Sequence, residues 1–581
     1  MNSVILALAG FIIFFLGYRF YSKFIADRIF CLQEFNGPTP AEEFEDGIDF
    51  VPTEKYILFG HHFTSIAGAA PIIGPCIAVY WGWLPAFLWI IFGTIFMGAV
   101  HDFGTLVTSV REKGRSIADL TSKVINSRTR IMFLIFVLLL VWLVLAVFAM
   151  VIAGLFVAFP ITVLPVNIEI FIAMLVGWQL YRRKLDAFLP SLLALVTLYI
   201  FIYIGTKFPL SFESFGLGSG QQNTLWIILL FIYSAIASLL PVWFLLQPRD
   251  YINSHQLFVG LSLLFIGLFV AHPVIDAPAF RSGGEDAPSI FPLLFVTIAC
   301  GAISGFHGLV SSGTTSKQIK RMHDTRFIGY GAMLGEGILA LASTLAAVAG
   351  IALVTSCSLP SVGIVDDLSW ANYYDTWGNA TANKAAAFVL GGGAFIQALG
   401  IPADIANGLM AVLVISFAAT TLDTATRIQR FIITELGEAV NIPILKNRYM
   451  ATAVAVIPAI LLALWNIVDP STGTSTQAGW VLWPIFGASN QMLAALTLMV
   501  LLLYSWSRKK PVLPLAIPFA FISIITLLTL IIKAGSFMGN NRLLFGIDVI
   551  LIILILWMLV EGMIKLVHGR DSIVETSQLN G

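Results

Sequence analysis

The sequence predicts an all-α polytopic membrane protein with about fifteen spans, in which two broken helices form an inverted repeat. Of its 581 residues, 58% are hydrophobic and 11% are charged, which excludes both a soluble globular chain and a disordered one. The hydrophobic residues fall into segments of about 20, the length that crosses a bilayer. Glycine-rich interruptions break two of these segments, and a membrane helix rarely tolerates them unless they line a polar cavity.

The overall charge and the cysteines narrow the function classes further. The formal net charge is zero, so nothing in the composition indicates a nucleic-acid partner. The four cysteines show no CxxC or other metal-ligand spacing, so neither a disulfide framework nor a thiolate metal site is predicted. We expect no cofactor beyond a coupling ion, H⁺ or Na⁺. The cysteines are Cys31, Cys76, Cys300 and Cys357.

The apolar segments make residues 1–581 a single transmembrane domain. In the first span, 4–22, the apolar run from Val4 to Leu16 lacks a cleavage site and is followed by Arg19, Lys23 and Arg28, which indicates a retained span with its N-terminus outside rather than a signal peptide. The region 384–399 is too short and glycine-rich for a span, so we interpret it as a re-entrant or surface segment. The other spans are expected at 56–79, 84–110, 131–159, 161–180, 187–205, 224–246, 254–272, 290–312, 328–356, 402–425, 449–468, 479–504, 513–533 and 544–567, the last four being the C-terminal spans.

The basic loops support this arrangement through the positive-inside rule. With fifteen spans, every Lys/Arg cluster falls on one side, and the opposite loops are acidic or neutral. We therefore expect the C-terminus in the cytoplasm. The broken segment 56–79 then leaves the cytoplasm and 290–312 enters it, the opposite directions that an inverted repeat requires. The basic loops are 111–130, 182–184, 317–326, 427–448 and 508–510.

The two broken segments carry the candidate substrate-binding residues. Half-helix N-termini near Gly68–Pro71 and Gly305–Gly308 would attract an anion through the helix dipole and unpaired N–H groups. Close packing through small residues is the alternative, but their combination with proline and histidine favours a cavity. The candidates are His61, His62, Ser65 and Gly68 in the first break, and Gly305, His307, Ser311 and Ser312 in the second.

The histidines admit two interpretations. Adjacent residues project about 100° apart on a helix, so His61 and His62 do not form an i,i+4 metal pair. Either they hydrogen-bond the backbone at a helix end, or one of them meets the substrate or a proton, since imidazole titrates near neutrality. His307 in the second break strengthens the functional interpretation, because the two breaks are expected to meet at the midplane.

Coupling-ion candidates lie in three other spans. Asp102, beside His101, and Glu336 are either structural residues paired with a basic group or proton carriers. Span 402–425 ends in a hydroxyl-rich run whose oxygens suit Na⁺. The alternative is an interhelical hydrogen-bond ladder in which Asp423 pairs with Arg427 four residues later. The candidates in this run are Thr420, Thr421, Asp423 and Thr424.

Two further polar runs receive structural interpretations. Asn490 and Gln491 are expected to join helices rather than to bind ligands. The stretch Gln247–Tyr251 is expected to form a cytoplasmic turn, either a gate or a helix cap. The sequence contains no phosphate-binding P-loop motif, which argues against an ATP-driven pump.

Several motifs, in the family's order, resemble the carbon starvation protein A family of bacterial inner-membrane transporters. His101 stands where that family's pattern has glutamine. The chain is also shorter than the longer members, so we expect it to lack their C-terminal portion. The matching stretches are Phe59–Phe63, Ala99–Phe103, Leu246–Tyr251, Ala299–His307, Ser311–Thr315, Thr421–Ala425 and Phe486–Gln491.

The resemblance implies uptake of small peptides or pyruvate, often under nutrient limitation. It also implies the amino acid–polyamine–organocation superfamily, with a leucine-transporter-like inverted repeat and extra peripheral helices. The broken first and sixth core helices of that fold correspond to 56–79 and 290–312. The eighth core helix, whose hydroxyls contribute to an ion site, brings Thr420, Thr421 and Thr424 beside the first.

The sequence predicts a secondary transporter, not an enzyme, in a lipid bilayer, which the resemblance implies is a bacterial inner membrane. It would import a carboxylate-bearing solute, a short peptide or pyruvate, driven by H⁺ or Na⁺ through alternating access. A solute channel is the alternative. An intramembrane enzyme is the weaker alternative, because only the adjacent histidines and Asp102 offer catalytic groups and no HExxH motif accompanies them.

Overall fold

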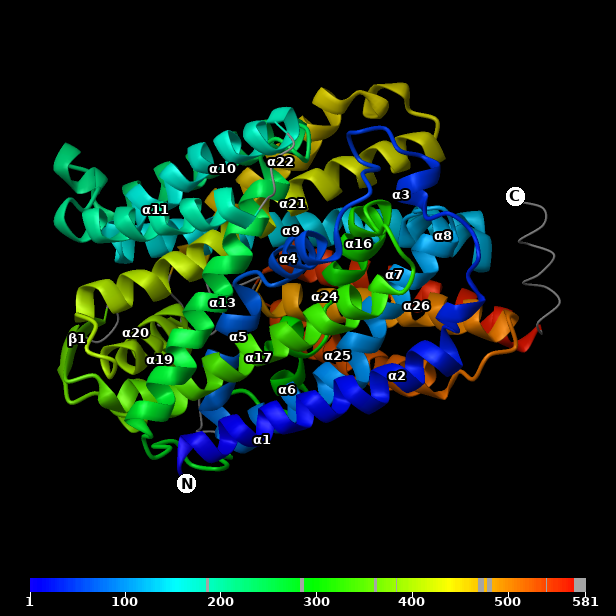
Figure 1. Cartoon of the computed structure of the whole chain (residues 1–581). Helices are drawn as coiled ribbons and strands as arrows, with labels where there is room; N and C mark the ends of the chain where they lie inside the picture. Colours follow the sequence, from blue (N-terminus) through cyan, green and yellow to red (C-terminus); the bar gives the residue numbers. More distant parts are fainter. Residues whose placement is uncertain are drawn as a thin grey trace.

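The computed structural model describes residues 1–183, 188–282, 287–359, 363–382, 384–468, 475–477, 483–539 and 541–568. Most of this part of the chain is helical (Figure 1). Two short antiparallel hairpins interrupt it, β1 (Ser356–Leu359) with β2 (Gly363–Asp366), and β3 (Asn466–Val468) with β4 (Ser475–Gln477).

The helices follow the apolar segments of the sequence. Turns of π-helix at Gly17–Tyr21 and Thr94–Gly98 continue the first helix and join the sixth to the seventh. The helices are α1 (Ser3–Leu16), α2 (Ser22–Phe24), α3 (Pro40–Glu43), α4 (Lys55–Ile66), α5 (Ala70–Ala78), α6 (Trp83–Gly93), α7 (Ala99–Arg111), α8 (Ile117–Val124), α9 (Ser127–Ala158), α10 (Val163–Arg183), α11 (Phe188–Lys207), α12 (Ser219–Leu239), α13 (Leu246–Ala271), α14 (Ile290–Thr297), α15 (Ala299–Ala302), α16 (Gly305–Gly313), α17 (Gly331–Leu345), α18 (Trp370–Tyr373), α19 (Trp377–Ala382), α20 (Lys384–Gln397), α21 (Ala403–Ala439), α22 (Arg448–Leu464), α24 (Trp483–Ser507), α25 (Leu513–Phe537) and α26 (Arg542–Val567).

In the described part of the chain, twelve helices are long and apolar enough to cross a membrane, or thirteen if the bent pair α4–α5 is one span. The two remaining predicted spans have different forms: 449–468 is the 17-residue helix α22, and 290–312 is divided among α14, α15 and α16. The predicted segments therefore correspond to helices, while the count of fifteen crossings stays a prediction. In Figure 1, α1 begins and α26 finishes at opposite ends of the molecule.

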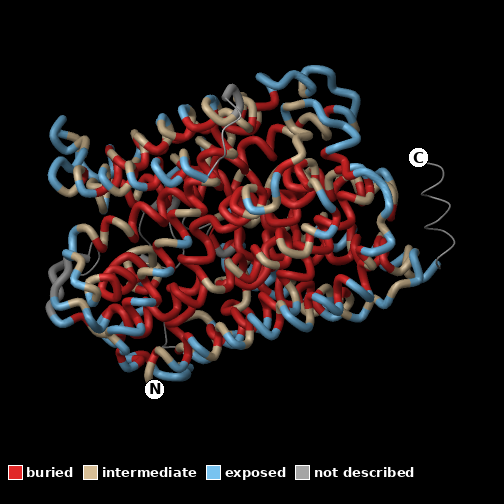
Figure 2. Tube along the Cα trace, viewed as in Figure 1, coloured by how far each residue is buried: buried red, intermediate tan, exposed pale blue. Residues whose placement is uncertain are grey.

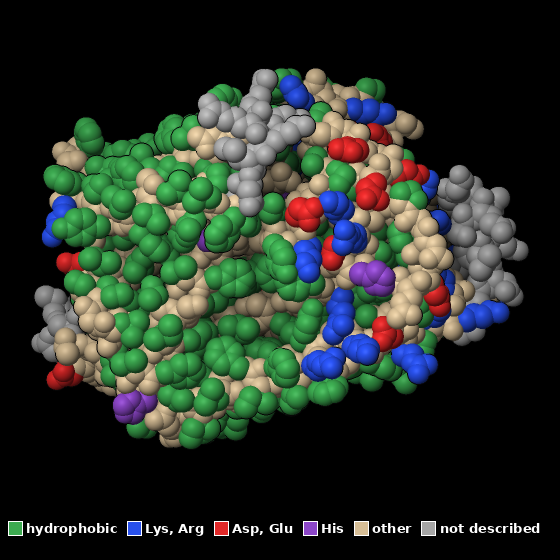
Figure 3. Space-filling view, viewed as in Figure 1, with side chains coloured by type: hydrophobic (Ala, Val, Ile, Leu, Met, Phe, Trp, Pro, Cys, Tyr) green, Lys and Arg blue, Asp and Glu red, His purple; other side chains and the backbone are tan. Residues whose placement is uncertain are grey.

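The surface matches a protein surrounded by lipid. Large hydrophobic side chains are exposed along the outer helices, including Phe15 on α1, Phe171 on α10 and Ile553 on α26, while buried residues fill the centre (Figure 2). On the face shown in Figure 3, most Lys and Arg side chains gather toward the end where α26 finishes. We call this the basic end.

At the basic end, Glu112 joins α7 to α8 and α24. It accepts hydrogen bonds from Lys123 Nζ at 2.7 Å, Tyr504 Oη at 2.9 Å and Arg508 Nη2 at 3.3 Å. Burial alone would raise the pKa of Glu112, but the hydrogen bond and charge of Lys123, with the other two partners, hold it below its ordinary value. The carboxylate thus stays ionised and fixes this end of the bundle.

The segment 384–399 is not a surface segment, which corrects one of its two interpretations. It contains α20, and its residues 387–396 are buried. A Cβ on Gly391 would lie 2.2 Å from the carbonyl oxygen of Ala346, and one on Gly393 would lie 2.0 Å from Asn407 Oδ1. The glycines that argued against a span are there because neighbouring helices pack directly on the α20 backbone.

The two broken segments run antiparallel. At the basic end, the N–H of Thr53, just before α4, donates to the carbonyl of Gln318, just after α16, at 3.0 Å. At the other end, Trp81 Nε1, after α5, donates to the carbonyl of Pro288, before α14, at 3.2 Å. The start of each segment therefore lies beside the end of the other.

The breaks themselves are in contact. A Cβ on Gly74 of α5 would lie 2.4 Å from the carbonyl oxygen of Thr297, and one on Gly301 of α15 would lie 3.7 Å from the Cα of Pro71. Glycine is required at 74 because the backbone of the second segment occupies the space of a side chain. The fold thus brings two interruptions, far apart in sequence, to one place in the bundle.

Candidate functional site

The first break bends the chain by 48° between α4 and α5. Ala67 leaves the helical conformation with ψ at 64°, and α5 resumes at Ala70. A Cβ on Gly68 would lie 2.9 Å from Thr421 Oγ1 and 3.1 Å from the ring of Phe148. The missing side chain therefore lets α21, with its hydroxyl-rich run, lie directly against this break.

The second break is closed by α24. Ile303 and Ser304 are extended, and α16 begins at Gly305. Asn490 Oδ1 accepts the N–H of Phe306 at 2.9 Å, and a Cβ on Gly305 would lie 2.4 Å from the Asn490 carbonyl oxygen. The anion site expected at Gly305–Gly308 is thus filled by protein atoms in this conformation. Asn490 joins two helices, as its structural interpretation holds.

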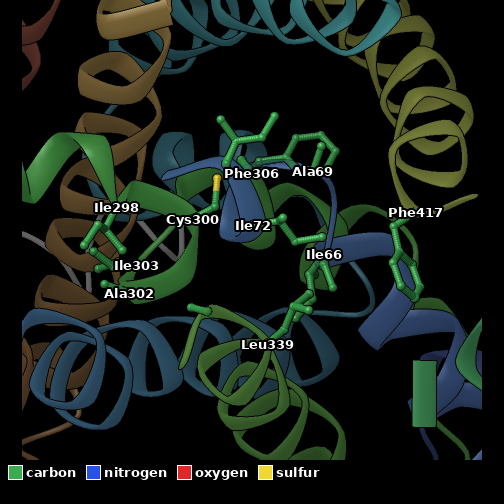
Figure 4. Close-up of a cluster of buried hydrophobic side chains, with 14 of the residues drawn as sticks. Ile66, Ala69, Ile72, Ile298, Cys300, Ala302, Ile303, Phe306, Leu339 and Phe417 are labelled. Carbon is green, nitrogen blue, oxygen red and sulfur yellow. The ribbon is translucent and has the colours of Figure 1, made fainter. Parts of the chain in front are cut away.

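Apolar side chains fill the space between the two breaks. Figure 4 shows Ile66 and Ala69 from the first break and Cys300 and Phe306 from the second, with Phe417 of α21 beside them. Each of these side chains is buried. The two breaks therefore share a cluster of buried apolar side chains.

One cluster of ionisable residues surrounds His307. His307 Nδ1 lies 2.8 Å from Asp102 Oδ2 of α7, and its Nε2 lies 3.1 Å from Glu336 Oε2 of α17, within ion-pair distance but outside hydrogen-bond geometry. The other oxygen of Asp102 is 2.7 Å from His101 Nδ1. All four side chains are 0% exposed. We call them the histidine–carboxylate cluster.

A second cluster surrounds Arg249 at the start of α13. Its Nη1 donates to Asp423 Oδ2 of α21 and to the hydroxyl of Tyr233 of α12, both at 2.6 Å. The Tyr233 hydroxyl donates to the same Asp423 oxygen at 2.7 Å. Glu169 Oε1 of α10 lies 3.5 Å from Arg249 Nε. We call these four residues the arginine–carboxylate cluster; its three charged members are 1% exposed.

His61 links the first break to this cluster. His61 Nδ1 pairs with Asp250 Oδ2, which also accepts the hydroxyl of Ser65 at 3.3 Å. His62 Nδ1 lies 2.9 Å from Thr315 Oγ1, at the end of the second broken segment. Each ring therefore contacts a side chain of a distant helix or turn, and the interpretation of the pair as a helix-end cap is wrong.

The hydroxyl run of α21 is only partly engaged. Thr420 Oγ1 accepts from Asn253 Nδ2 at 2.9 Å, which is an interhelical hydrogen bond. Within the described residues, Thr421 Oγ1 and Thr424 Oγ1 are buried without a hydrogen-bond partner. The local pair of Asp423 with Arg427 is wrong, because Asp423 binds Arg249, while Arg427 donates to the carbonyls of Ala237 and Leu240.

The serines of the second break differ from each other. Ser312 Oγ donates to the Gly308 carbonyl at 2.7 Å and accepts the N–H of Ile117, the first residue of α8, at 3.1 Å. Ser311 Oγ is buried and has no hydrogen-bond partner in the part of the chain that the structure describes. Ser311 is therefore the one with an unused hydroxyl.

The sequence interpretation missed Tyr233, Arg249 and Glu169 of the arginine–carboxylate cluster, and Asp250 beside it. Arg249 and Asp250 were assigned to a cytoplasmic turn, yet they lie in the first turns of α13 and are each 1% exposed. Glu169 was not singled out. It is the one ionisable residue of the predicted span 161–180, and this isolated charge in an apolar span is the signal that could have identified it.

The charge balance of the two clusters and Asp250 is uneven. Five carboxylates face one guanidinium and three imidazoles, so protons on the rings or carboxyls, or a bound cation, must supply neutrality. Among the described residues, no group of three or more His, Cys, Asp or Glu side chains is arranged to hold a metal ion. The carboxylates are Asp102, Glu169, Asp250, Glu336 and Asp423, and the imidazoles are His61, His101 and His307.

These features define a multi-pass helical membrane protein with ionisable residues buried around two broken helices, the arrangement typical of secondary transporters. The sequence model of one family, described as carbon starvation protein CstA, matches residues 2–529, and the chain belongs to that family. The resemblance seen in the motifs is therefore confirmed.

Similar proteins carry transporter names. A Helicobacter pylori protein named peptide transporter CstA is 33% identical over 94% of this chain and 84% of its own. An Escherichia coli protein named pyruvate/proton symporter BtsT is 32% identical over 86% of this chain and 77% of its own. A solved structure of an Eremococcus coleocola manganese transporter covers 90% of this chain and 99% of its own, with 12% identity and a TM-score of 0.47.

Proposed function

We propose that this protein is a secondary transporter of the bacterial inner membrane that imports a small carboxylate-bearing solute, a short peptide or pyruvate. A proton gradient drives uptake by alternating access. The names of the relatives support the solute class. The leucine-transporter-like fold of the amino acid–polyamine–organocation superfamily is part of the proposal, as is an N-terminus outside and a C-terminus in the cytoplasm. The basic end, where α26 finishes, supports that orientation.

The observation that carries the proposal is that both broken helices hold ionisable side chains that are buried away from solvent. His61 on the first segment reaches Asp250, and His307 on the second reaches Asp102 and Glu336. Burying ionisable groups is expensive, and in membrane proteins they mark ion and solute pathways. These side chains are sealed from solvent, which favours alternating access over a continuously open channel.

Protons are the coupling ion that the charge balance favours. His307 on α16 lies between carboxylates of α7 and α17. A proton bound there therefore changes the charge of a cluster that joins these three helices. Binding or release of that proton alters which conformation is stable. We assign the coupling proton to the histidine–carboxylate cluster.

Sodium coupling is the second candidate, and a specific observation favours it. Thr421 and Thr424 hold unused hydroxyl oxygens, and Thr421 Oγ1 lies against Gly68 of the first break. Asp423 on the same helix supplies a carboxylate, although Arg249 occupies one of its oxygens. Na⁺ would therefore bind at Thr421, Thr424 and the carbonyls near Ser65–Gly68, with Thr420 released from Asn253.

The solute's carboxylate has a better partner than the helix N-terminus expected at Gly305. Arg249 is a buried guanidinium whose planar fork suits a carboxylate. We assign the carboxylate to Arg249, which would exchange its contact with Asp423 for one with the solute. His61, His62, Ser65 and Ser311 supply the remaining hydrogen bonds.

Uptake into proteoliposomes tests the proposal. Labelled dialanine and pyruvate are supplied outside, and either an inside-alkaline proton gradient or an inward Na⁺ gradient is imposed. We expect saturable accumulation of one solute under the proton gradient and its collapse with a protonophore. Accumulation of neither solute, uptake that rises linearly without saturation, or chemically altered solute inside the vesicles contradicts the proposal.

A further inference from the structure

A cavity at the basic end lies outside both charged clusters. It opens between the start of α8, the end of α16 and the last third of α21, and its volume is about 110 Å³. Its wall includes Ser116, Leu309, Ser312, Lys317, Phe431 and Glu435.

The cavity wall presents one cation and one anion. Lys317 Nζ lies 5.2 Å from the ring centre of Phe431 and 5.4 Å from that of Phe50. Glu435 Oε2 accepts a hydrogen bond from Ser116 Oγ at 2.9 Å. Neither charge has an ion-pair partner among the described residues. Both charges therefore remain available to a ligand.

We propose that this cavity binds a small zwitterion, with the ligand's ammonium group at Glu435 and its carboxylate at Lys317. A zwitterion satisfies both charges at once, and the apolar wall formed by Leu309 and Phe431 accommodates its side chains. A monocarboxylate such as pyruvate would satisfy Lys317 but leave Glu435 unpaired. The inference rests on the proposed function and deepens it: the solute is a short peptide with free ends.

The position of the cavity makes it the inner end of the solute pathway. Leu309 and Ser312 follow His307 by two and five residues on α16, which is about 3 and 7.5 Å along the helix axis. Ser312 also joins α16 to α8 through its hydrogen bond with the N–H of Ile117. Helix α16 thus forms a wall of the cavity and also carries His307. A zwitterion bound in the cavity therefore lies close to the histidine to which we assign the coupling proton.

Equilibrium binding to the purified full-length protein tests this inference. The ligands are dialanine, its N-acetyl derivative without the ammonium charge, its amide without the carboxylate, and pyruvate. We expect the wild type to bind dialanine at least tenfold more tightly than either blocked form. Because Asp423 and Tyr233 hold Arg249 in this conformation, the selectivity reports the cavity and not the Arg249 site. Glu435→Gln should bind dialanine and its N-acetyl derivative equally, and Lys317→Gln should bind dialanine and its amide equally.

Two matched variants control for surface charge and folding. Glu438→Gln removes an exposed carboxylate three residues further along α21, and it should bind all four ligands as the wild type does. Glu435→Asp keeps the charge and should keep the preference for a free ammonium group, whereas a merely structural carboxylate would give no such rescue of ligand selectivity.

The outcomes separate this inference from the proposed function. If Glu435→Gln and Lys317→Gln keep the wild-type selectivity while the wild type still accumulates solute, the cavity is not the binding site and the transporter stands. If dialanine shows no binding, or blocked dialanine binds the wild type as tightly as free dialanine, the inference is overturned. If the selectivity changes as expected but no solute accumulates, the cavity site stands and the proposed transport function falls.

Discussion

Replacing His307 with glutamine removes the one imidazole that lies between two buried carboxylates. The ring is 2.8 Å from Asp102 and 3.1 Å from Glu336, and no member of this trio is exposed. Asp102 keeps His101 at 2.7 Å, but Glu336 has no other ion-pair partner in the described chain. The substitution therefore leaves Glu336 buried and unpaired.

The loss of this buried pair determines how much His307→Gln should destabilise the folded protein. Removing one partner of a buried ion pair costs about 3–5 kcal/mol. We expect His307→Gln to lower the free energy of unfolding by about that amount, and His307→Gln combined with Glu336→Gln to recover about half of it, because the unpaired carboxylate is then neutral. Thermal unfolding in detergent measures both values.

The same variant separates coupling from solute binding. Since His307 carries the coupling proton in our proposal, His307→Gln should reduce proton-driven accumulation at least a hundredfold. Counterflow, in which labelled solute exchanges for unlabelled solute without a net proton movement, should continue. His323→Gln, at an exposed position, serves as the matched control. Proton-driven accumulation by His307→Gln at the wild-type level would refute the assignment.

Three further substitutions have definite expected results. Gly74→Ala places a Cβ 2.4 Å from the Thr297 carbonyl oxygen, so the two breaks must separate, and the melting temperature should fall by the equivalent of about 1–3 kcal/mol. Arg249→Lys keeps the charge but has a single nitrogen, so it cannot face Glu169 and Asp423 from two nitrogens as the guanidinium does, and uptake should fall about tenfold or more while the protein stays folded. Glu112 has a lowered pKa in the folded state, so its stabilisation is present above its unfolded pKa of about 4.3 and is lost as the pH falls through the lower folded value. The melting temperature of Glu112→Gln should therefore lie below that of the wild type at pH 7, and the difference should shrink as the pH falls below about 4.3 and vanish below the folded-state pKa; a difference that stays constant as the pH falls would contradict the ion pairs at the basic end.

The sequence located the helices and both breaks because hydrophobicity and backbone chemistry are local properties. A run of about 20 apolar residues predicts a span wherever it occurs, and glycine and proline interrupt a helix regardless of what surrounds it. The same reasoning failed at 384–399, where three adjacent glycines indicated an interruption. Their cause is the close approach of neighbouring helices to α20, which depends on packing rather than on α20 itself.

The charged partners were not predictable because they are remote in sequence. Asp423 has a plausible local partner in Arg427, four residues away, but binds Arg249, which is 174 residues away. Hydropathy also started the span of α13 at 254, whereas the helix begins at Leu246 and includes the polar turn with Arg249 and Asp250. Arg249 and Asp250 can be buried in the bundle because they pair there with carboxylates on α10 and α21 and with a histidine on α4.

The resemblance to a known family identified the residues around the breaks but not their partners. It drew attention to His61, His307 and Asp102, and the structure joins each of them to another ionisable residue. The N-terminus of α16 departs from expectation because Asn490, on a helix that begins almost 180 residues after Gly305, caps it. Only the folded chain reveals such a cap.

Proton movement caused by the solute tests the central claim most directly. Wild-type proteoliposomes loaded with a pH-sensitive dye receive external dialanine without any imposed gradient, and the internal pH is followed. Proton-coupled import predicts acidification of the interior that saturates with dialanine concentration and is absent in His307→Gln. Dialanine uptake without any change in internal pH, or the same acidification in His307→Gln, would contradict it.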